Sequence, residues 1–164
     1  MDKVTAKKRQ ILQQITQYII AHGFADIGVR KLASVAGTSD RMLIYYFETK
    51  DGLIGQVLNA IASNFTQQLD ALLGHHQRTP DVLMQELLTL AQSPEFEPII
   101  CLWFELVGLA ARGQEPYATN ATAIANNWLQ WIVGRLEDEY VDQATALFAE
   151  LEGRLMLSVV GVEL

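Results

Sequence analysis

The sequence has one cysteine, Cys101, among its 164 residues, so it cannot form an internal disulfide bond and has no cysteine cluster for a metal. Charged residues make up only 19% of the chain and hydrophobic residues 50%, a balance that argues against intrinsic disorder. The longest apolar run, from Ile99 to Phe104, is far shorter than the ~20 residues that span a bilayer. The N-terminus also lacks an apolar signal segment. We therefore expect a soluble, cytoplasmic globular protein.

Lysine is absent after residue 50, and the two parts of the chain on either side of this residue differ in charge. Residues 1–50 contain eight Lys and Arg against four Asp and Glu, whereas residues 51–164 contain four against 15. The first part therefore has a net charge of +4 and the second a net charge of −11. A basic module on an acidic body is typical of a protein whose one end meets a polyanion, although a chance excess on a solvated face would give the same numbers.

Apolar residues recur at helical spacing along nearly the whole chain, and no segment alternates as a half-buried strand would. The spacing predicts a helix over residues 5–22, ended by Gly23, and two short helices separated by a tight turn at Gly37. Ser39 can cap the second of these. Longer helices are predicted over 49–73, 80–92, 99–112, 117–139 and 142–162. The sequence thus predicts an all-α protein of about nine helices.

The two short helices carry a recognisable composite motif. The stretch from Val29 to Ser39 reads VRKLASVAGTS, and Leu43, the run YYFETK over 45–50 and Leu53 follow it. Over about residues 5–60, this pattern resembles the DNA-binding domain of the TetR/AcrR family of transcriptional regulators. The resemblance implies a three-helix helix-turn-helix domain in residues 1–50 and a ligand-binding and dimerisation domain in 51–164, which begins with the long helix over about 49–73.

The residue types support a DNA-binding role at these positions. The helix after Ser39 would present its N-terminal end to the major groove. The resemblance implies that Arg30 can reach a base, where guanine would suit its guanidinium group, and Arg41 can contact a base or a phosphate. Lys50 lies beside the start of the long helix, so its charge and the free amides can address one phosphate, although it could equally be a solvated charge. The candidate DNA-binding residues are Arg30, Thr38, Ser39, Asp40, Arg41, Met42, Tyr45, Tyr46 and Lys50.

The predicted recognition helix departs from the family pattern. Arg41, Met42 and Ile44 stand where the family often has glycine, threonine and tyrosine, and Gly28 replaces the usual Ser or Thr cap. Asp40 is unusual on a surface that faces DNA; it can accept from cytosine N4 or favour the helix N-terminus by its charge. These departures bear on the operator sequence rather than on the fold.

An effector pocket is expected between the long helix and the helix over 99–112. An apolar lining would favour a small hydrophobic or aromatic molecule, although such residues are more often plain core. Glu105 lies in an otherwise apolar helix, where it either pairs with an arginine such as Arg112 or Arg154 or binds a cationic ligand group. The candidate pocket residues are Phe65, Met84, Leu88, Cys101, Trp103, Phe104, Glu105 and Met156.

The last two predicted helices carry bulky apolar stripes, and two such helices from each subunit would make the four-helix interface that the resemblance implies. Their residues are candidates for the dimer interface or for the core: Trp128, Trp131, Leu136, Leu147, Leu151 and Leu155. The pair His75-His76 has no partners at metal-ligand spacing, and no catalytic constellation is present in the sequence. We therefore expect no metal, no cofactor and no enzymatic activity.

The sequence predicts a ligand-responsive transcriptional repressor that binds palindromic operator DNA as a homodimer and is released by a small effector. The alternative is a helical small-molecule- or partner-binding protein that has lost specific DNA binding, which Asp40 and the acidic body would suit. The sequence ends at Val162, Glu163 and Leu164 without an evident helix cap, which is compatible with a longer natural chain.

Overall fold

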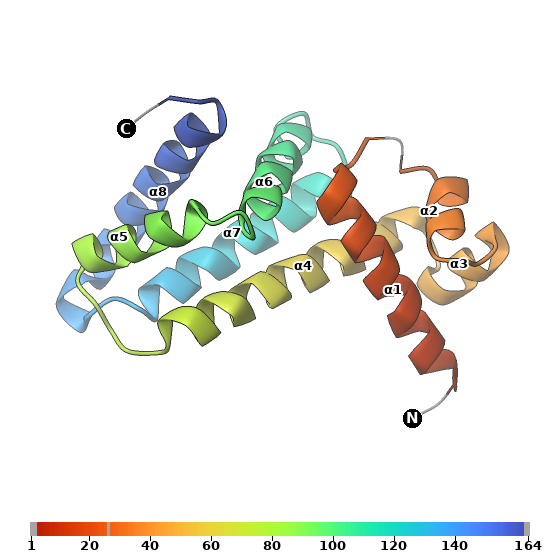
Figure 1. The fold of residues 1–164 in the computed structure, drawn as a ribbon, viewed down its shortest axis with the longest axis horizontal. Coiled ribbons are helices and arrows are strands. Elements are labelled where there is room, and N and C mark those ends of the chain that lie inside the picture. The colour runs from red at the N-terminus through yellow and green to blue at the C-terminus, as the bar shows by residue number, and fades with distance from the viewer. Residues whose placement is uncertain (1–2, 26, 163–164) are drawn as a thin grey trace. The chain divides into compact units, whose positions relative to one another are not determined.

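The structure, a computed structural model, describes residues 3–25 and 27–162. These residues form eight α-helices and one short 3-10 helix, and they include no strand (Figure 1). The predicted all-α fold is confirmed. None of the described helices combines the length and the apolar character that crossing a membrane requires. In chain order the elements are α1 (Lys3–His22), α2 (Val29–Val35), α3 (Asp40–Phe47), α4 (Lys50–Leu73), α5 (Pro80–Ala91), α6 (Glu97–Ala110), α7 (Tyr117–Val133), η1 (Asp138–Gln143) and α8 (Ala144–Val159).

Packing divides the chain into two compact units. Unit 1 comprises residues 1–64 and 105–121, and unit 2 comprises residues 65–104 and 122–164. Helices α4, α6 and α7 therefore contribute residues to both units. The units are defined by contacts alone, so the functional boundary expected at residue 50 stays a prediction.

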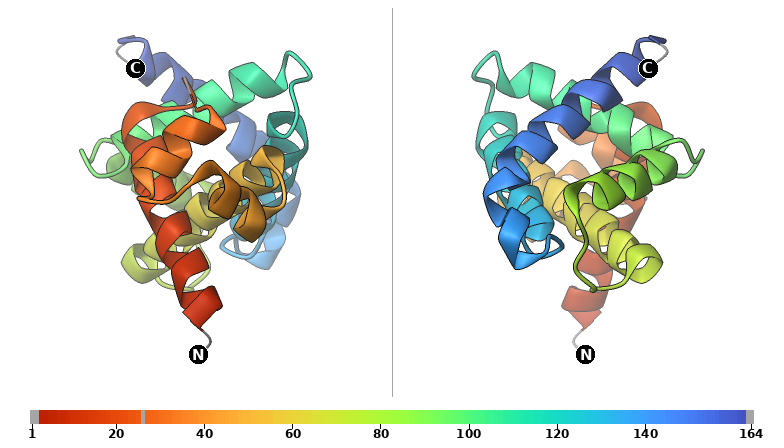
Figure 2. Two further views of the ribbon diagram at one scale, coloured as in Figure 1. Left: turned by 90° about the vertical axis from the view of Figure 1, so that its right-hand side faces the viewer. Right: turned by 90° about the vertical axis from the view of Figure 1, so that its left-hand side faces the viewer.

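Unit 1 contains α1, α2, α3 and the first part of α4, which Figure 2 (left) shows from the side of α2 and α3. α1 buries Ile11, Ile15 and Ile19 completely, as its predicted stripe required. The turn between α2 and α3 uses Gly37 at φ +56°, a backbone conformation that a side chain would resist, and the N–H of Thr38 donates to the carbonyl of Ala33 at 2.9 Å. The predicted helix-turn-helix pair is therefore present.

Side-chain caps determine where α3 and α4 begin. The hydroxyl of Ser39 accepts from the N–H of Met42 at 3.2 Å, and the hydroxyl of Thr49 accepts from the N–H of Gly52 at 2.9 Å. A side chain is excluded at Gly52, because a Cβ there would lie 2.7 Å from the carbonyl oxygen of Phe47. The end of α3 and the start of α4 are thus held in close contact.

Unit 2 contains the last part of α4, α5, the first part of α6, most of α7, η1 and α8, and α5 packs against α8 (Figures 1 and 2). α5 begins at Pro80 as predicted, with the proline in the first turn where its missing N–H costs nothing. Thr79 precedes the helix, but its side chain forms no cap hydrogen bond. The buried core of the unit consists of Leu69, Leu83, Met84, Leu87, Phe96, Ile132, Leu136, Ala144, Leu147 and Leu151.

Several helix boundaries differ from prediction, three of them at the start of α6 and around the break between α7 and α8. α6 begins at Glu97 rather than at 99, because Pro98 lies inside its first turn instead of ahead of it. α7 ends at Val133 rather than continuing to 139, and α8 begins at Ala144 rather than at 142. The break after α7 has a distant cause: the N–H of Arg78 donates to the carbonyl of Arg135 at 2.8 Å, and the N–H of Glu137 donates to the carbonyl of Arg78 at 3.0 Å. This bridge takes residues after Gly134 out of the helix.

Candidate functional site

The first turn of α3 forms an exposed polar edge in unit 1. Ser39, Asp40 and Arg41 are exposed there, while Leu43 and Phe47 on the opposite side of the helix are buried. Met42 is 38% exposed and Tyr45 67% exposed, which is unusual for large apolar or aromatic side chains. α3 thus packs against unit 1 by one face and leaves the other face exposed to solvent.

Further candidates surround this helix. Lys50, the first residue of α4, and Tyr46 are half-buried, and the Tyr46 ring lies edge-on to that of Tyr45 with centroids 5.4 Å apart. On α1, the ammonium of Lys8 lies over the Phe47 ring, 5.1 Å from its centroid. A lysine of α1 therefore lies next to the junction of α3 and α4, where it adds positive charge to the surface.

The start of α2 has no side-chain cap. Gly28 precedes the helix in an extended conformation and provides no side-chain cap, while Arg30 in the first turn is exposed. Thr38 is half-buried in the turn before α3. Arg30 and the first turn of α3 are thus available to solvent from the same unit, as a surface that reads DNA would require.

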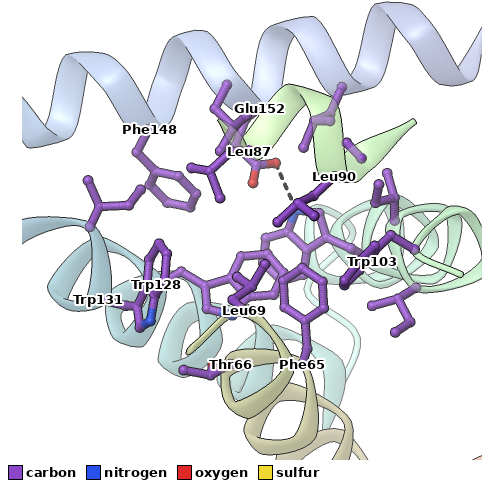
Figure 3. A pocket seen from close by; sticks show the side chains of 17 residues that line it. Phe65, Thr66, Leu69, Leu87, Leu90, Trp103, Trp128, Trp131, Phe148 and Glu152 are labelled. Atoms are coloured by element: carbon purple, nitrogen blue, oxygen red, sulfur yellow. Dashed lines mark hydrogen bonds between the residues drawn. The ribbon is translucent and has the colours of Figure 1, made fainter. Parts of the chain in front are cut away.

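A second site lies within unit 2, where residues of five helices, α4 to α8, enclose an apolar pocket (Figure 3). Its walls are densely aromatic: the Trp128 ring lies 4.8 Å from that of Trp103 and 5.3 Å from that of Phe65, centroid to centroid. The hollow holds about 710 Å³ when its open mouth is included, but the part wide enough for a water molecule is only about 70 Å³. A flat, ring-sized group suits such a space better than a bulky ligand.

One carboxylate lies among these rings. The indole N–H of Trp103 donates to Oε2 of Glu152 at 2.7 Å, which the dashed line in Figure 3 marks. Burial raises the pKa of Glu152 above its usual value, although the hydrogen bond from Trp103 acts in the opposite direction. Among the residues that line the pocket, Glu152 alone is ionisable.

Hydrogen bonds fix another part of the wall. The indole N–H of Trp131 donates to Oδ1 of Asp70 at 2.7 Å, and Arg135 binds the same oxygen while lying 4.9 Å from the Trp131 ring centroid. Burial pushes the pKa of Asp70 up, but the hydrogen bonds from Trp131 and Arg135 outweigh it and bring that pKa below its usual value. Nδ1 of His75 lies 2.8 Å from Arg135 and completes the cluster.

The structure brings together only some of the residues predicted for a pocket. Phe65 and Trp103 line the hollow, Met84 is buried in the core, and Leu88 is half-buried. Outside the lining lie Cys101, which is exposed, Phe104, which is half-buried, and Met156, which is 48% exposed.

Glu105 belongs to unit 1 and binds backbone. Its Oε1 accepts from the N–H of Phe24 at 2.9 Å, next to Gly23, which turns at φ +71° after α1. Neither of the arginines named as its partner, Arg112 or Arg154, forms an ion pair with it in the described part of the chain; Arg154 pairs with Glu150 instead. Glu105 thus holds the loop that follows α1.

The residues expected in a dimer interface or the core fall into two groups, one in the core of unit 2 and one in the wall of the pocket. Leu136, Leu147 and Leu151 are buried in the core of unit 2, and Leu151 also lines the pocket. The half-buried members, Trp128, Trp131 and Leu155, line the pocket too. The solvent-facing side of α8 carries other residues, among them Met156 and Val159, which is 44% exposed.

Sequence reasoning missed Glu152 and Phe148 as pocket residues. Glu152 follows Leu151 and precedes Leu155 in an apolar stripe, and a carboxylate in such a place was a signal that could have found it. No group of three or more His, Cys, Asp or Glu side chains with a metal-binding arrangement occurs among the described residues.

Comparison with known proteins agrees with this geometry. Residues 11–57 match the family model of bacterial regulatory proteins, tetR family. No curated relative matches the chain. Three solved structures share its fold, although their low sequence identities support a likeness of fold alone.

The first, from Streptomyces coelicolor A3(2), is assigned as a transcriptional regulator; it is 21% identical, with a TM-score of 0.77 over 96% of this chain and 89% of that one. The second, from Rhodococcus sp., is assigned to the TetR family; it is 24% identical, with a TM-score of 0.72 over 94% and 88%. The third, from Mesorhizobium loti MAFF303099, is also assigned to the TetR family and is 19% identical, with a TM-score of 0.63 over 99% and 87%.

The exposed first turn of α3, the caps at Ser39 and Thr49 and the turn at Gly37 all lie in the part of the chain that matches the family model. The family is one of transcriptional regulators rather than of enzymes. Residues 11–57 thus match the family model of bacterial regulatory proteins, tetR family, and the chain shares the fold of solved structures that are assigned as transcriptional regulators of that family.

Proposed function

We propose that this protein is a ligand-responsive repressor that binds palindromic operator DNA as a homodimer in the cytoplasm and is released by a small hydrophobic or aromatic effector. The observation that carries the DNA-binding part is the exposed first turn of α3, with Arg41 and Tyr45 facing solvent and Lys50 at the start of α4. The N-terminal part of a helix fits the major groove, and a basic residue at a helix start can hold a phosphate.

Fluorescence anisotropy tests this proposal directly. The purified protein is titrated against duplexes tiled from the DNA upstream of its own gene, with unrelated duplex as competitor, at two salt concentrations. Binding that resists the competitor and weakens with salt supports the repressor and identifies the operator. If no duplex binds specifically while small molecules still stabilise the protein, the alternative of a helical binding protein without DNA specificity is favoured.

The apolar pocket supports the effector part of the proposal. α6 carries Trp103, which lines the pocket in unit 2, and two positions later Glu105, which holds the N–H of Phe24 in unit 1. A ligand that displaces Trp103 would therefore act on the helix that also holds the loop after α1. We propose that this shift favours a dimer whose recognition helices no longer match major grooves about 34–36 Å apart.

The homodimer is proposed on the last two helices. The solvent-facing side of α8 combines small residues, Ala149 and Gly153, with exposed Met156 and Val159, and nothing within 4 Å would meet a Cβ at Gly153. Small residues let a second helix approach closely, and exposed apolar side chains gain from being covered. This side of α8, rather than the buried leucines, is the part that a second copy would cover.

A further inference from the structure

The strongest feature outside the DNA-binding surface is the carboxylate in the aromatic pocket. Glu152 lies among Phe65, Trp103, Trp128 and other apolar side chains of unit 2, and no lysine, arginine or histidine of the described residues forms an ion pair with it. Its neighbour on α8, Arg154, is turned to Glu150, at 2.7 Å. Glu152 is half-buried, and a carboxylate that is partly withdrawn from water without a cation beside it is costly, so proteins rarely keep one without a use.

The pocket wall holds a second incomplete polar group. The indole nitrogen of Trp128 is buried without a hydrogen-bond partner in the structure. By contrast, the indoles of Trp103 and Trp131 both donate to carboxylates, at 2.7 Å each. The pocket therefore contains a carboxylate without a cation and a donor without an acceptor, and a cationic ligand would supply the first of these missing partners.

Resting on the proposed function, we propose that the effector is a cation: a ring-sized aromatic or aliphatic compound whose positively charged nitrogen pairs with Glu152. The face of an aromatic ring attracts a cation, and here the Trp128 ring lies 4.8 Å from that of Trp103 and 5.3 Å from that of Phe65, centroid to centroid. The carboxylate supplies the opposite charge, and the apolar wall around it reduces the screening of such a pair.

The three tryptophans of the chain, Trp103, Trp128 and Trp131, all line this pocket. Intrinsic fluorescence of the full chain therefore reports on the pocket without a label. The probes are benzyltrimethylammonium and its neutral carbon isostere neopentylbenzene, which differ in charge but hardly in shape, together with the matched pair that carries a naphthyl ring. Because a quaternary nitrogen does not titrate, any preference between the two members of a pair reflects its fixed charge.

We expect the cation of at least one pair to bind the wild type about tenfold or more tighter than its neutral isostere, a difference of about 1.4 kcal/mol. In Glu152→Gln this preference should disappear, with the loss confined to the cation. Glu150→Gln is the matched control, since it removes a carboxylate from the same helix outside the pocket lining, and it should keep the preference.

Equal or tighter binding of the neutral isosteres to the wild type would overturn the inference, yet leave the pocket as the site of a hydrophobic effector. A preference that survives in Glu152→Gln would overturn it as well, as would failure of both cations to bind. The regulator itself is judged separately by the DNA titration, so these failures do not count against DNA binding.

Discussion

Single side chains on the proposed DNA-binding surface differ in the kind of contact that they can make with DNA. Arg41 has a forked guanidinium in the exposed first turn of α3, whereas Lys50 is a point charge at the start of α4. A fork can read the edge of a base, while an ammonium beside free helix amides holds a phosphate whatever the sequence.

The prediction is that Lys50→Ala weakens binding to all duplexes alike and lowers the salt slope by about 1. Arg41→Ala should instead cost roughly 1–3 kcal/mol at one operator position and relax the preference there. Anisotropy on the operator and on its single-base variants measures both effects. Arg154→Ala, which removes an exposed charge in unit 2, should change neither. Equal losses on every sequence for both DNA-surface variants would contradict this division.

The negative charge of Glu152 lowers the stability of the folded protein, and this effect can be measured without any ligand. Because its pKa is raised, the stability that its carboxyl contributes is present below the ordinary glutamate pKa of about 4.3 and is lost as pH rises through the raised pKa. Glu152→Gln keeps an acceptor for the Trp103 indole and carries no charge. It should raise Tm at pH 7 and leave Tm unchanged near pH 4, as scanning calorimetry can show.

The pKa of Asp70 is shifted in the opposite direction from that of Glu152, so Asp70 serves as a comparison. The hydrogen bonds from Trp131 and Arg135 bring its pKa below the usual value, so its contribution is present at neutral pH and is lost as pH falls through the lowered pKa. Asp70→Asn should therefore lower Tm at pH 7, and the loss should shrink in acid. If both variants moved Tm in the same direction at pH 7, the assignment of the two carboxyl environments would be wrong.

At the scale of elements, the junction between α3 and α4 depends on a glycine. A Cβ on Gly52 would lie 2.7 Å from the carbonyl oxygen of Phe47. This clash is with a backbone atom, which cannot move away by a side-chain rotation. Gly52→Ala should therefore destabilise the protein by about 1–3 kcal/mol, although alanine favours a helix elsewhere. Urea unfolding measures the change. Gly108→Ala in α6, where nothing lies within 4 Å of the added Cβ, should be neutral or stabilising by up to about 1 kcal/mol.

Local signals explain why most elements could be predicted from the sequence. Ser39 and Thr49 each accept from an amide of the following turn, and Gly37 adopts the positive φ that its place in the motif required. By contrast, the end of α7 at Val133 depends on the backbone of Arg78, which is far away in the sequence. Periodicity carries no information about such a bridge, so the helix was predicted too long.

The pocket was harder to predict for the same reason. Its wall gathers side chains from α4, α5, α6, α7 and α8, and spacing along one helix says which residues share a face but not which faces meet. Phe65 and Trp103 were correctly predicted as pocket residues because bulky aromatic side chains are typical of the lining of a ligand pocket. The place of Glu152 in an apolar stripe was a signal that it is partly buried, but only the convergence of these helices brings its carboxylate to the Trp103 indole.

At the scale of the whole molecule, the proposed repressor requires two copies that hold two recognition helices at a fixed spacing. The exposed apolar side of α8 is the proposed contact, with Val159 44% and Met156 48% exposed. A charge placed there would have to be buried without a partner when two copies meet, which is strongly unfavourable.

Val159→Glu should therefore shift the protein toward monomers, as sedimentation velocity over a range of concentrations can measure. Val82→Glu is the matched control, because Val82 is 47% exposed on α5 and the same change there should leave the dimer intact. Affinity for the full palindrome should fall with Val159→Glu, since each subunit then binds alone, while affinity for an isolated half-site should change little because α3 is untouched. A Val159→Glu variant that remains dimeric and binds the palindrome as the wild type does would place the dimer contact elsewhere on the molecule.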